Sequence, residues 1–146
     1  MMQPSVLLVD DEVAFVETLV KRLAKRDVRV VAAHSGHEAL EKLAASGPTR
    51  IDVVVLDVKM PGMDGLETLA RIKEEHPLIE VIMLTGHATV ESAIEGMKRG
   101  AFDYLMKPCE IDVLLDKINE AADKKREHED RILEARASLI SLRRGD

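Results

Sequence analysis

A seven-residue run near the middle of the chain has the composition of a strand that is buried on both faces. Residues 51–57 read Ile-Asp-Val-Val-Val-Leu-Asp, and five of the first six are apolar. Runs of this kind are typical of parallel sheets, which helices cover on both sides. The run ends on Asp57, after which Pro61 and Gly62 mark a loop. Ligands of open α/β sheets bind at the carboxyl ends of the strands, so Asp57 is the first candidate for chemistry.

The same order of apolar run, polar loop and helical spacing recurs along the chain. We expect strands at residues 6–9, 28–33, 51–57, 81–84 and 103–106. Apolar residues recur at helical spacing after each strand, and two helices open with capping signals, Ser35 with Glu38 and Asp64 with Glu67. Five β-α units with short connections predict an α/β fold, with a doubly wound five-stranded parallel sheet and helices on both faces.

Length and charge restrict the class of protein. A chain of 146 residues suits one domain with a real core. The net charge of -6 argues against direct binding of nucleic acid, which depends on clustered basic residues. The chain has one cysteine, Cys109, and no stretch apolar enough to span a bilayer or to act as a secretory signal. A cytoplasmic location without membrane contact is therefore expected.

Polar residues able to act on a phosphoryl group end four of the five expected strands. They are Asp10, Asp11, Asp57, Thr85 and Lys107. Parallel strands bring these ends to one edge, where three carboxylates would repel each other by roughly 3 kcal/mol per pair at about 5 Å. A divalent cation removes that repulsion, and carboxylate ligands with open sites for water and phosphate suit Mg²⁺. The lysine and the threonine hydroxyl would bind phosphoryl oxygens.

These residues, together with the loop Met60-Pro61-Gly62-Met63-Asp64-Gly65, Tyr104 and Pro108, closely resemble the receiver domain of two-component response regulators. The resemblance covers about Val6 to Ala121 and is nearest to the nitrogen-regulation class. It implies a flavodoxin-like sheet in the order 2-1-3-4-5. It also implies that the bond between Lys107 and Pro108 is cis.

The resemblance assigns roles to the site residues. Asp57 would accept a phosphoryl group from a histidine of a sensor histidine kinase or a histidine phosphotransfer protein. Asp11 would bind Mg²⁺ directly and Asp10 through water, with Asp57 and the backbone carbonyl of Lys59 completing the protein ligands. Lys107 and Thr85 would hold the phosphoryl oxygens.

The resemblance also implies a switch. Thr85 and Tyr104 would move together on phosphorylation and change the face formed by the fourth helix, the fifth strand and the fifth helix. Lys59 and His87 lie two positions beyond Asp57 and Thr85, where the family tunes the lifetime of the phosphoryl group. Either residue is equally well read as a solvated loop residue.

The C-terminal segment extends beyond a minimal receiver. We expect a receiver domain at residues 1–122, with Ile118 as its last buried residue, and a helical extension or linker at residues 123–146. Residues 123–131 are polar all round but contain oppositely charged pairs at helical spacing, such as Lys125 with Glu129. An apolar stripe follows, at Ile132, Leu133, Leu139, Ile140 and Leu142. It predicts a weak homodimer through this helix, and the other interpretation is a linker to a missing domain.

The expected function is a phosphorylation-controlled binding module that catalyses only its own phosphorylation and dephosphorylation. The alternative within the family is the regulatory fragment of a longer transcription factor. A haloacid-dehalogenase-like phosphohydrolase would also use an aspartyl phosphate, but its acid/base aspartate lies two residues after the nucleophile. Lys59 occupies that position here, which argues against the hydrolase.

Overall fold

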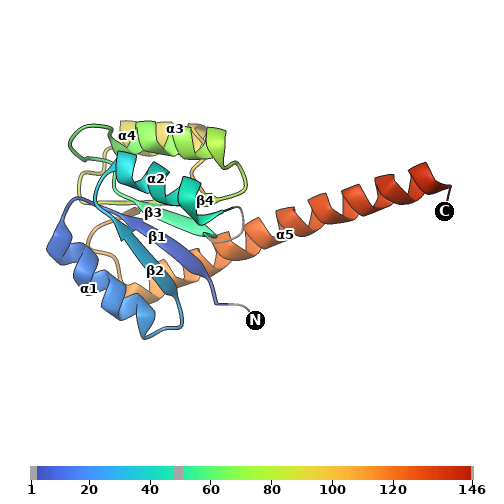
Figure 1. The fold of residues 1–146 in the computed structure, drawn as a ribbon. Helices are drawn as coiled ribbons and strands as arrows, with labels where there is room; N and C mark the ends of the chain where they lie inside the picture. Colours follow the sequence, from blue (N-terminus) through green and yellow to red (C-terminus); the bar gives the residue numbers. More distant parts are fainter. Residues whose placement is uncertain (1–2, 48–50, 146) are drawn as a thin grey trace.

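The computed structural model describes residues 3–47 and 51–145, and it consists of a parallel sheet between two layers of helices (Figure 1). The strands are β1 (Ser5–Val9), β2 (Arg29–Ala33), β3 (Val53–Leu56), β4 (Glu80–Thr85) and β5 (Asp103–Met106). The helices are α1 (Val13–Ala24), α2 (Gly36–Ser46), α3 (Gly65–Glu75), α4 (Val90–Lys98) and α5 (Ile111–Arg144). The strand order is β2-β1-β3-β4-β5, and every pair is parallel. The predicted fold class and strand order are confirmed.

The two faces of the sheet bury separate apolar clusters. Alternate residues of β3 point to opposite faces, so Val53 and Val55 join the cluster under α1 and α5, whereas Val54 and Leu56 join the cluster under α2 and α3. All four are essentially inaccessible to solvent. Burial on both faces explains why the strand carries no alternation of polar and apolar residues.

Hydrogen bonds at the carboxyl edge extend the sheet into the loops that carry polar residues. The backbone N–H of Asp57 donates to the carbonyl of Val9 at 3.0 Å. At the neighbouring strands, the N–H of Lys107 donates to the carbonyl of Thr85 at 2.8 Å. Asp57 and Lys107, each the first residue after its strand, are therefore fixed by a backbone hydrogen bond to the adjacent strand.

Helix capping agrees with the sequence signals in part. The Ser35 hydroxyl accepts from the N–H of Glu38, and the Asp64 carboxylate accepts from the N–H of Glu67. The Glu38 carboxylate does not complete a box with Ser35, because it accepts from the N–H of His34. The bond between Lys107 and Pro108 is cis, as the resemblance implied.

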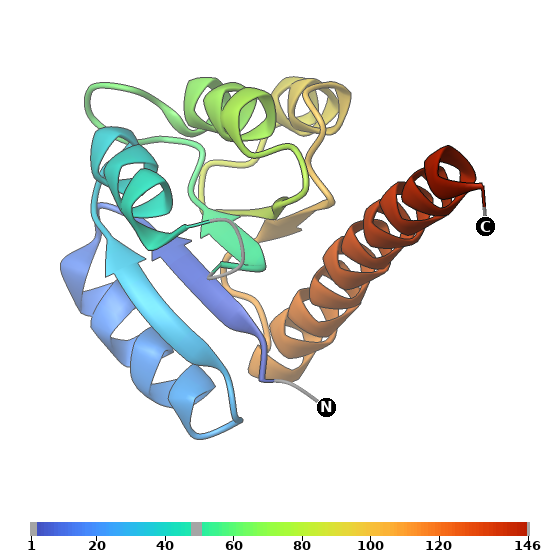
Figure 2. The same cartoon turned by 45° about the vertical axis from the view of Figure 1, so that its right-hand side comes forward.

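Helix α5 is a single helix of 34 residues that leaves the body of the molecule (Figures 1 and 2). The expectation that Ile118 is the last buried residue is wrong, since Ala121, Ala122 and Lys125 are also buried. Lys125 is buried because its ammonium reaches Asp52, 3.2 Å away at the start of the chain segment leading into β3. The expected pair of Lys125 with Glu129 is present at 3.4 Å.

Every described residue of α5 from Asp130 onward is exposed, including the apolar stripe. No helix in the described part of the chain is both long enough and apolar enough to cross a membrane. Residues 1–2, 48–50 and 146 fall inside the expected domain ranges but lie outside the described residues.

Candidate functional site

Three carboxylates meet at the carboxyl edge of the sheet. One oxygen from each of Asp10, Asp11 and Asp57 lies within 4.8 Å of the other two. Asp10 and Asp57 are 1% and 2% exposed, whereas Asp11 faces solvent. The central position of β1 and β3 in the sheet brings the ends of these two strands together, and the acidic loop after β1 supplies two of the three groups.

Asp57 keeps one oxygen without a partner. Within residues 3–47 and 51–145, Oδ1 of Asp57 is the buried side-chain oxygen or nitrogen that has no hydrogen bond. A buried acceptor left unpaired costs free energy, and such atoms are common where a ligand binds. The donor set also fits a hard divalent cation, because all three groups offer carboxylate oxygens and one side of the cluster is open. The arrangement therefore has the chemistry of a Mg²⁺ site.

Lys107 places a positive charge against this cluster. Its Nζ donates to Oδ2 of Asp10 at 2.6 Å and to Oε1 of Glu12 at 3.3 Å, and it lies 4.0 Å from Oδ2 of Asp57. Burial by itself would lower the pKa of Lys107, but the hydrogen bond to Asp10 and the surrounding acidic charges outweigh it and raise the pKa. The lysine is therefore held as a cation beside Asp57.

The pKa of Asp10 is raised. Burial is the largest cause, and the charge of Asp57 acts in the same direction. The Lys107 ammonium and the N–H of Glu12, which donates to Oδ1 at 2.9 Å, oppose the shift. The pKa of Asp10 is therefore raised because its charged form loses hydration and is repelled by the neighbouring carboxylate.

The fourth strand contributes Thr85, which is fully buried. Its hydroxyl oxygen accepts from the N–H of His87 at 3.0 Å. His87 and Lys59 are exposed, and both line an open cleft of about 560 Å³ that also contains Asp11 and Asp57. The expected loop residues thus lie around the opening above Asp57.

The loop after Asp57 returns tightly to its own start. The N–H of Gly65 donates to the carbonyl of Val58 at 2.7 Å. A Cβ at this glycine would overlap the carbonyl oxygen of Asp57, so no larger residue fits without moving the backbone. The close approach fixes the start of α3 against the candidate site.

The Tyr104 ring lies against α4. Its hydroxyl is 2.6 Å from the hydroxyl of Ser92, which also forms a capping box with Thr89 at the first turn of that helix. Gly96 of the same helix lies beside the ring, and a Cβ there would make ordinary van der Waals contact with a ring carbon at 3.6 Å. The two residues expected to move together, Thr85 and Tyr104, are therefore engaged with different partners in this structure.

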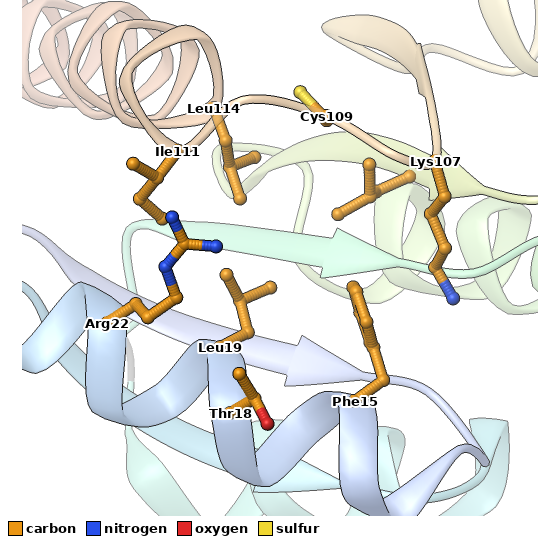
Figure 3. Close-up of a pocket in the computed structure, with 9 residues that line it drawn as sticks. Phe15, Thr18, Leu19, Arg22, Lys107, Cys109, Ile111 and Leu114 are labelled. Atoms are coloured by element: carbon orange, nitrogen blue, oxygen red, sulfur yellow. The ribbon is translucent and has the colours of Figure 1, made fainter.

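A cavity of about 140 Å³ lies between α1 and the start of α5, and Lys107 is one of the residues that line it (Figure 3). Leu19 projects from α1 toward Leu114 on the opposite side, and Phe15 projects from the same helix beside Lys107 (Figure 3). Cys109 also lines it, and burial raises the pKa of its thiol. A thiol with a raised pKa carries little thiolate, so Cys109 is a packing residue of the cavity wall rather than a nucleophile.

Sequence reasoning brought together the acidic residues, Thr85 and Lys107, but it missed three neighbours. Glu12 pairs with Lys107, Phe15 lies under the same ammonium, and Ser92 holds Tyr104. A Thr89 to Ser92 spacing is a capping signal, but it does not indicate which distant side chain binds there. Among the described residues, His34 and His37 are not part of the acidic group, although Nδ1 of His34 lies 3.1 Å from the carbonyl oxygen of Asp10.

Comparisons with known proteins agree with this geometry. The family model described as the response regulator receiver domain matches residues 6–119. The DNA-binding transcriptional regulator NtrC of Escherichia coli (strain K12) is 41% identical over 107 residues, which are 73% of this chain and 22% of that protein. The chain thus spans about a fifth of the length of this curated relative.

Solved structures give the same result. A response regulator receiver domain protein from Clostridium thermocellum superposes with a TM-score of 0.79 at 36% identity, covering 84% of this chain and 97% of that one. A response regulator protein from Burkholderia pseudomallei, solved with a phosphorylated aspartic acid, a calcium ion and citrate, has a TM-score of 0.72 and 29% identity. That likeness covers 86% of this chain and 72% of the other.

Proposed function

This chain belongs to the response regulator receiver family, and on that premise we propose that Asp57 is the residue that accepts the phosphoryl group. The single observation that carries the proposal is the unpartnered, buried Oδ1 of Asp57 beside two further carboxylates and an ammonium. The phosphorylated aspartic acid and the divalent ion named for the Burkholderia pseudomallei relative support the same assignment.

In the proposed reaction, a carboxylate oxygen of Asp57 forms a bond to phosphorus as the bond from phosphorus to a histidine nitrogen breaks. The electron pair of the broken bond leaves with the imidazole of the donor. Lys107 and Thr85 bind the phosphoryl oxygens, and the positive charge of the lysine stabilises the negative charge that gathers there. In the later hydrolysis, a water oxygen forms a bond to phosphorus as the bond from phosphorus to the Asp57 oxygen breaks, which releases inorganic phosphate and regenerates the Asp57 carboxylate.

The cofactor in this proposal is Mg²⁺, which Asp11, Asp57 and the backbone carbonyl of Lys59 would hold directly and Asp10 would hold through water. When bound, the ion neutralises the carboxylates and the phosphoryl oxygens that face them. Acidic oxygens clustered within 4.8 Å support this set. The fold itself orients the two buried carboxylates, because backbone hydrogen bonds fix Asp10 and Asp57 at the ends of β1 and β3.

We propose that the phosphoryl group also controls a binding face. When Thr85 binds a phosphoryl oxygen, its hydroxyl leaves the N–H of His87 and vacates space beside β4 and β5. Tyr104 can then leave Ser92 and rotate inward, which changes the surface of α4, β5 and α5. Val90, Ile94 and Met106 on that surface are between 51% and 77% exposed, so apolar area is available to a protein partner.

The proposed phosphodonor is a sensor histidine kinase or a histidine phosphotransfer protein, and the proposed location is the cytoplasm. We propose no direct contact with nucleic acid or membrane for this chain, which acts on itself and turns over no metabolite. A second candidate is the regulatory part of a longer transcription factor. The small share of NtrC that the chain spans favours it, and the size of the endogenous protein on an immunoblot tests it.

The phosphorylation proposal is tested with acetyl phosphate and intact-mass spectrometry. The full chain should gain one phosphoryl group, and only with Mg²⁺ present. Asp57→Asn should gain none, whereas Asp123→Asn, on the exposed side of α5, should behave as the unmodified chain. Undiminished labelling of Asp57→Asn would refute the assignment, and multiple turnover of a generic phosphate ester would instead support a hydrolase.

A further inference from the structure

The ammonium of Lys107 lies over the ring of Phe15, with 4.0 Å between Nζ and the ring centroid. Phe15 belongs to α1 and Lys107 follows β5, so the contact joins two elements that both line the cavity (Figure 3). The Lys107 side chain is only 13% exposed, and Phe15 is partly buried against the core. An ammonium at this distance from a ring face is attracted by the negative charge of the π system, more strongly where water is excluded.

The ring differs in kind from the other partners of this ammonium. Asp10 and Glu12 hold Lys107 by charge, but Asp10 also belongs to the proposed metal ligands and Glu12 is largely exposed. Once Asp10 is engaged elsewhere, its attraction for Lys107 weakens. The ring binds no metal and carries no titrating proton, so its attraction persists.

We propose that Phe15 is a positioning residue for phosphoryl transfer, holding the Lys107 ammonium toward Asp57 through a cation–π contact. This inference rests on the proposed function of Asp57 and Lys107. Phe15 itself touches no reacting atom. Its effect passes through Lys107, which already lies 4.0 Å from Oδ2 of Asp57.

The competing explanation is that Phe15 only fills space beside Leu19 and Leu84 on the cavity wall. A packing role depends on shape, whereas a cation–π role depends on the charge of the ring face. Fluorine atoms on the ring reduce the negative charge of the face and change the shape little. Progressive fluorination therefore separates the two explanations.

The experiment replaces Phe15 in the full chain with monofluoro-, difluoro- and trifluorophenylalanine. The rate constant for phosphorylation by acetyl phosphate at saturating Mg²⁺ should fall with each added fluorine, by about fivefold for the trifluoro ring. The matched control is the same series at Phe102, where the Lys124 ammonium lies 5.6 Å from the ring centroid at the other edge of the sheet. The Phe102 series should leave the rate unchanged.

A second readout needs neither metal nor phosphorylation. In the metal-free protein, the ring current of Phe15 should shift the NMR signals of the Lys107 side chain upfield, and Phe15→Leu should abolish the shift. A flat fluorine series at Phe15 in a chain that is phosphorylated normally would overturn the positioning role alone. A chain that shows the shift but is never phosphorylated at Asp57 would overturn the proposed function and the inference with it.

Discussion

Asp11 and Lys107 have opposite charges at the same site, and their removal should have separable effects on metal binding. Asp11→Ala removes a proposed carboxylate ligand and should weaken Mg²⁺ binding by about tenfold or more. Lys107→Ala removes a cation that competes with the metal for Asp10, so Mg²⁺ affinity should stay the same or rise. Phosphorylation of Lys107→Ala should nevertheless be slow, because the phosphoryl oxygens lose their positive partner.

Calorimetric titration of both variants with Mg²⁺ measures the difference, with Lys21→Ala on the exposed side of α1 as the control. Equal weakening in Asp11→Ala and Lys107→Ala would contradict the separate roles.

Lys59 and His87 lie around the opening through which water must reach a phosphoryl group on Asp57. Side chains at this opening can obstruct or orient the attacking water. Replacing both residues with alanine should therefore change the rate of dephosphorylation by more than about twofold, which corresponds to roughly 0.4 kcal/mol of barrier. The decay of the phosphorylated mass measures this rate. The control is Lys21→Ala with His37→Ala, and a smaller change than twofold would mean that both are only solvated loop residues.

Helix α5 is attached to the sheet by a cluster of charges at the edge opposite Asp57. The Asp52 carboxylate accepts from Lys125 and Arg126, both at 3.2 Å, and from the N–H of Ser5 at 2.9 Å. The Lys125 side chain is 1% exposed, and its ammonium also forms an ion pair with Glu129 at 3.4 Å. Buried charges of this kind cost free energy unless they are paired.

The two members of this pair should differ in their effect on stability. Asp52→Asn leaves Lys125 buried with Glu129 alone and should lower the free energy of unfolding by about 3 kcal/mol. Lys125→Met should cost less, about 1 to 2 kcal/mol, because Asp52 keeps Arg126 and the N–H of Ser5. Urea denaturation measures both, with Asp123→Asn as the control. A larger loss for Lys125→Met than for Asp52→Asn would contradict this account.

The molecule as a whole consists of a globular receiver and an exposed helix that leaves it (Figure 2). Along that helix, Leu133 and Leu142 are 61% and 74% exposed, and Leu139 and Ile140 are about half exposed. An isolated helical stripe of this length is marginal in water unless a second apolar surface covers it. A second copy of the chain offers the same stripe, which is why we propose weak dimerisation through α5.

Sedimentation equilibrium should show a reversible dimer for the full chain and a monomer for a chain that ends at Asp130. Truncation at Ala122 would be a poor test, because it removes Lys125 from the core. Leu133→Ser with Leu139→Ser should also give the monomer, while Arg131→Ser, a matched exposed residue, should not. Monomers under every condition, including with beryllofluoride as a phosphoryl mimic, would identify the helix as a linker only.

The sequence alone determined the sheet and the place of the site. Strands such as residues 51–57 are recognisable because burial on both faces requires a continuous apolar run. Because all strands of a parallel sheet run in the same direction, their carboxyl ends lie at one edge of the sheet. Asp10, Asp57 and Lys107 each follow a strand and therefore share that edge.

Only the tertiary structure decided which side chains meet across that framework. Lys125 belongs to a segment that is polar all round, yet it is buried because Asp52, 73 residues earlier, supplies a partner. Two further contacts also join residues from different elements: the ring of Phe15 lies under Lys107, and the hydroxyl of Ser92 holds that of Tyr104. Contacts of this kind depend on the packing of distant helices to within an ångström or two. A local pattern fixes the face on which a residue lies, but it does not specify the residue that lies opposite.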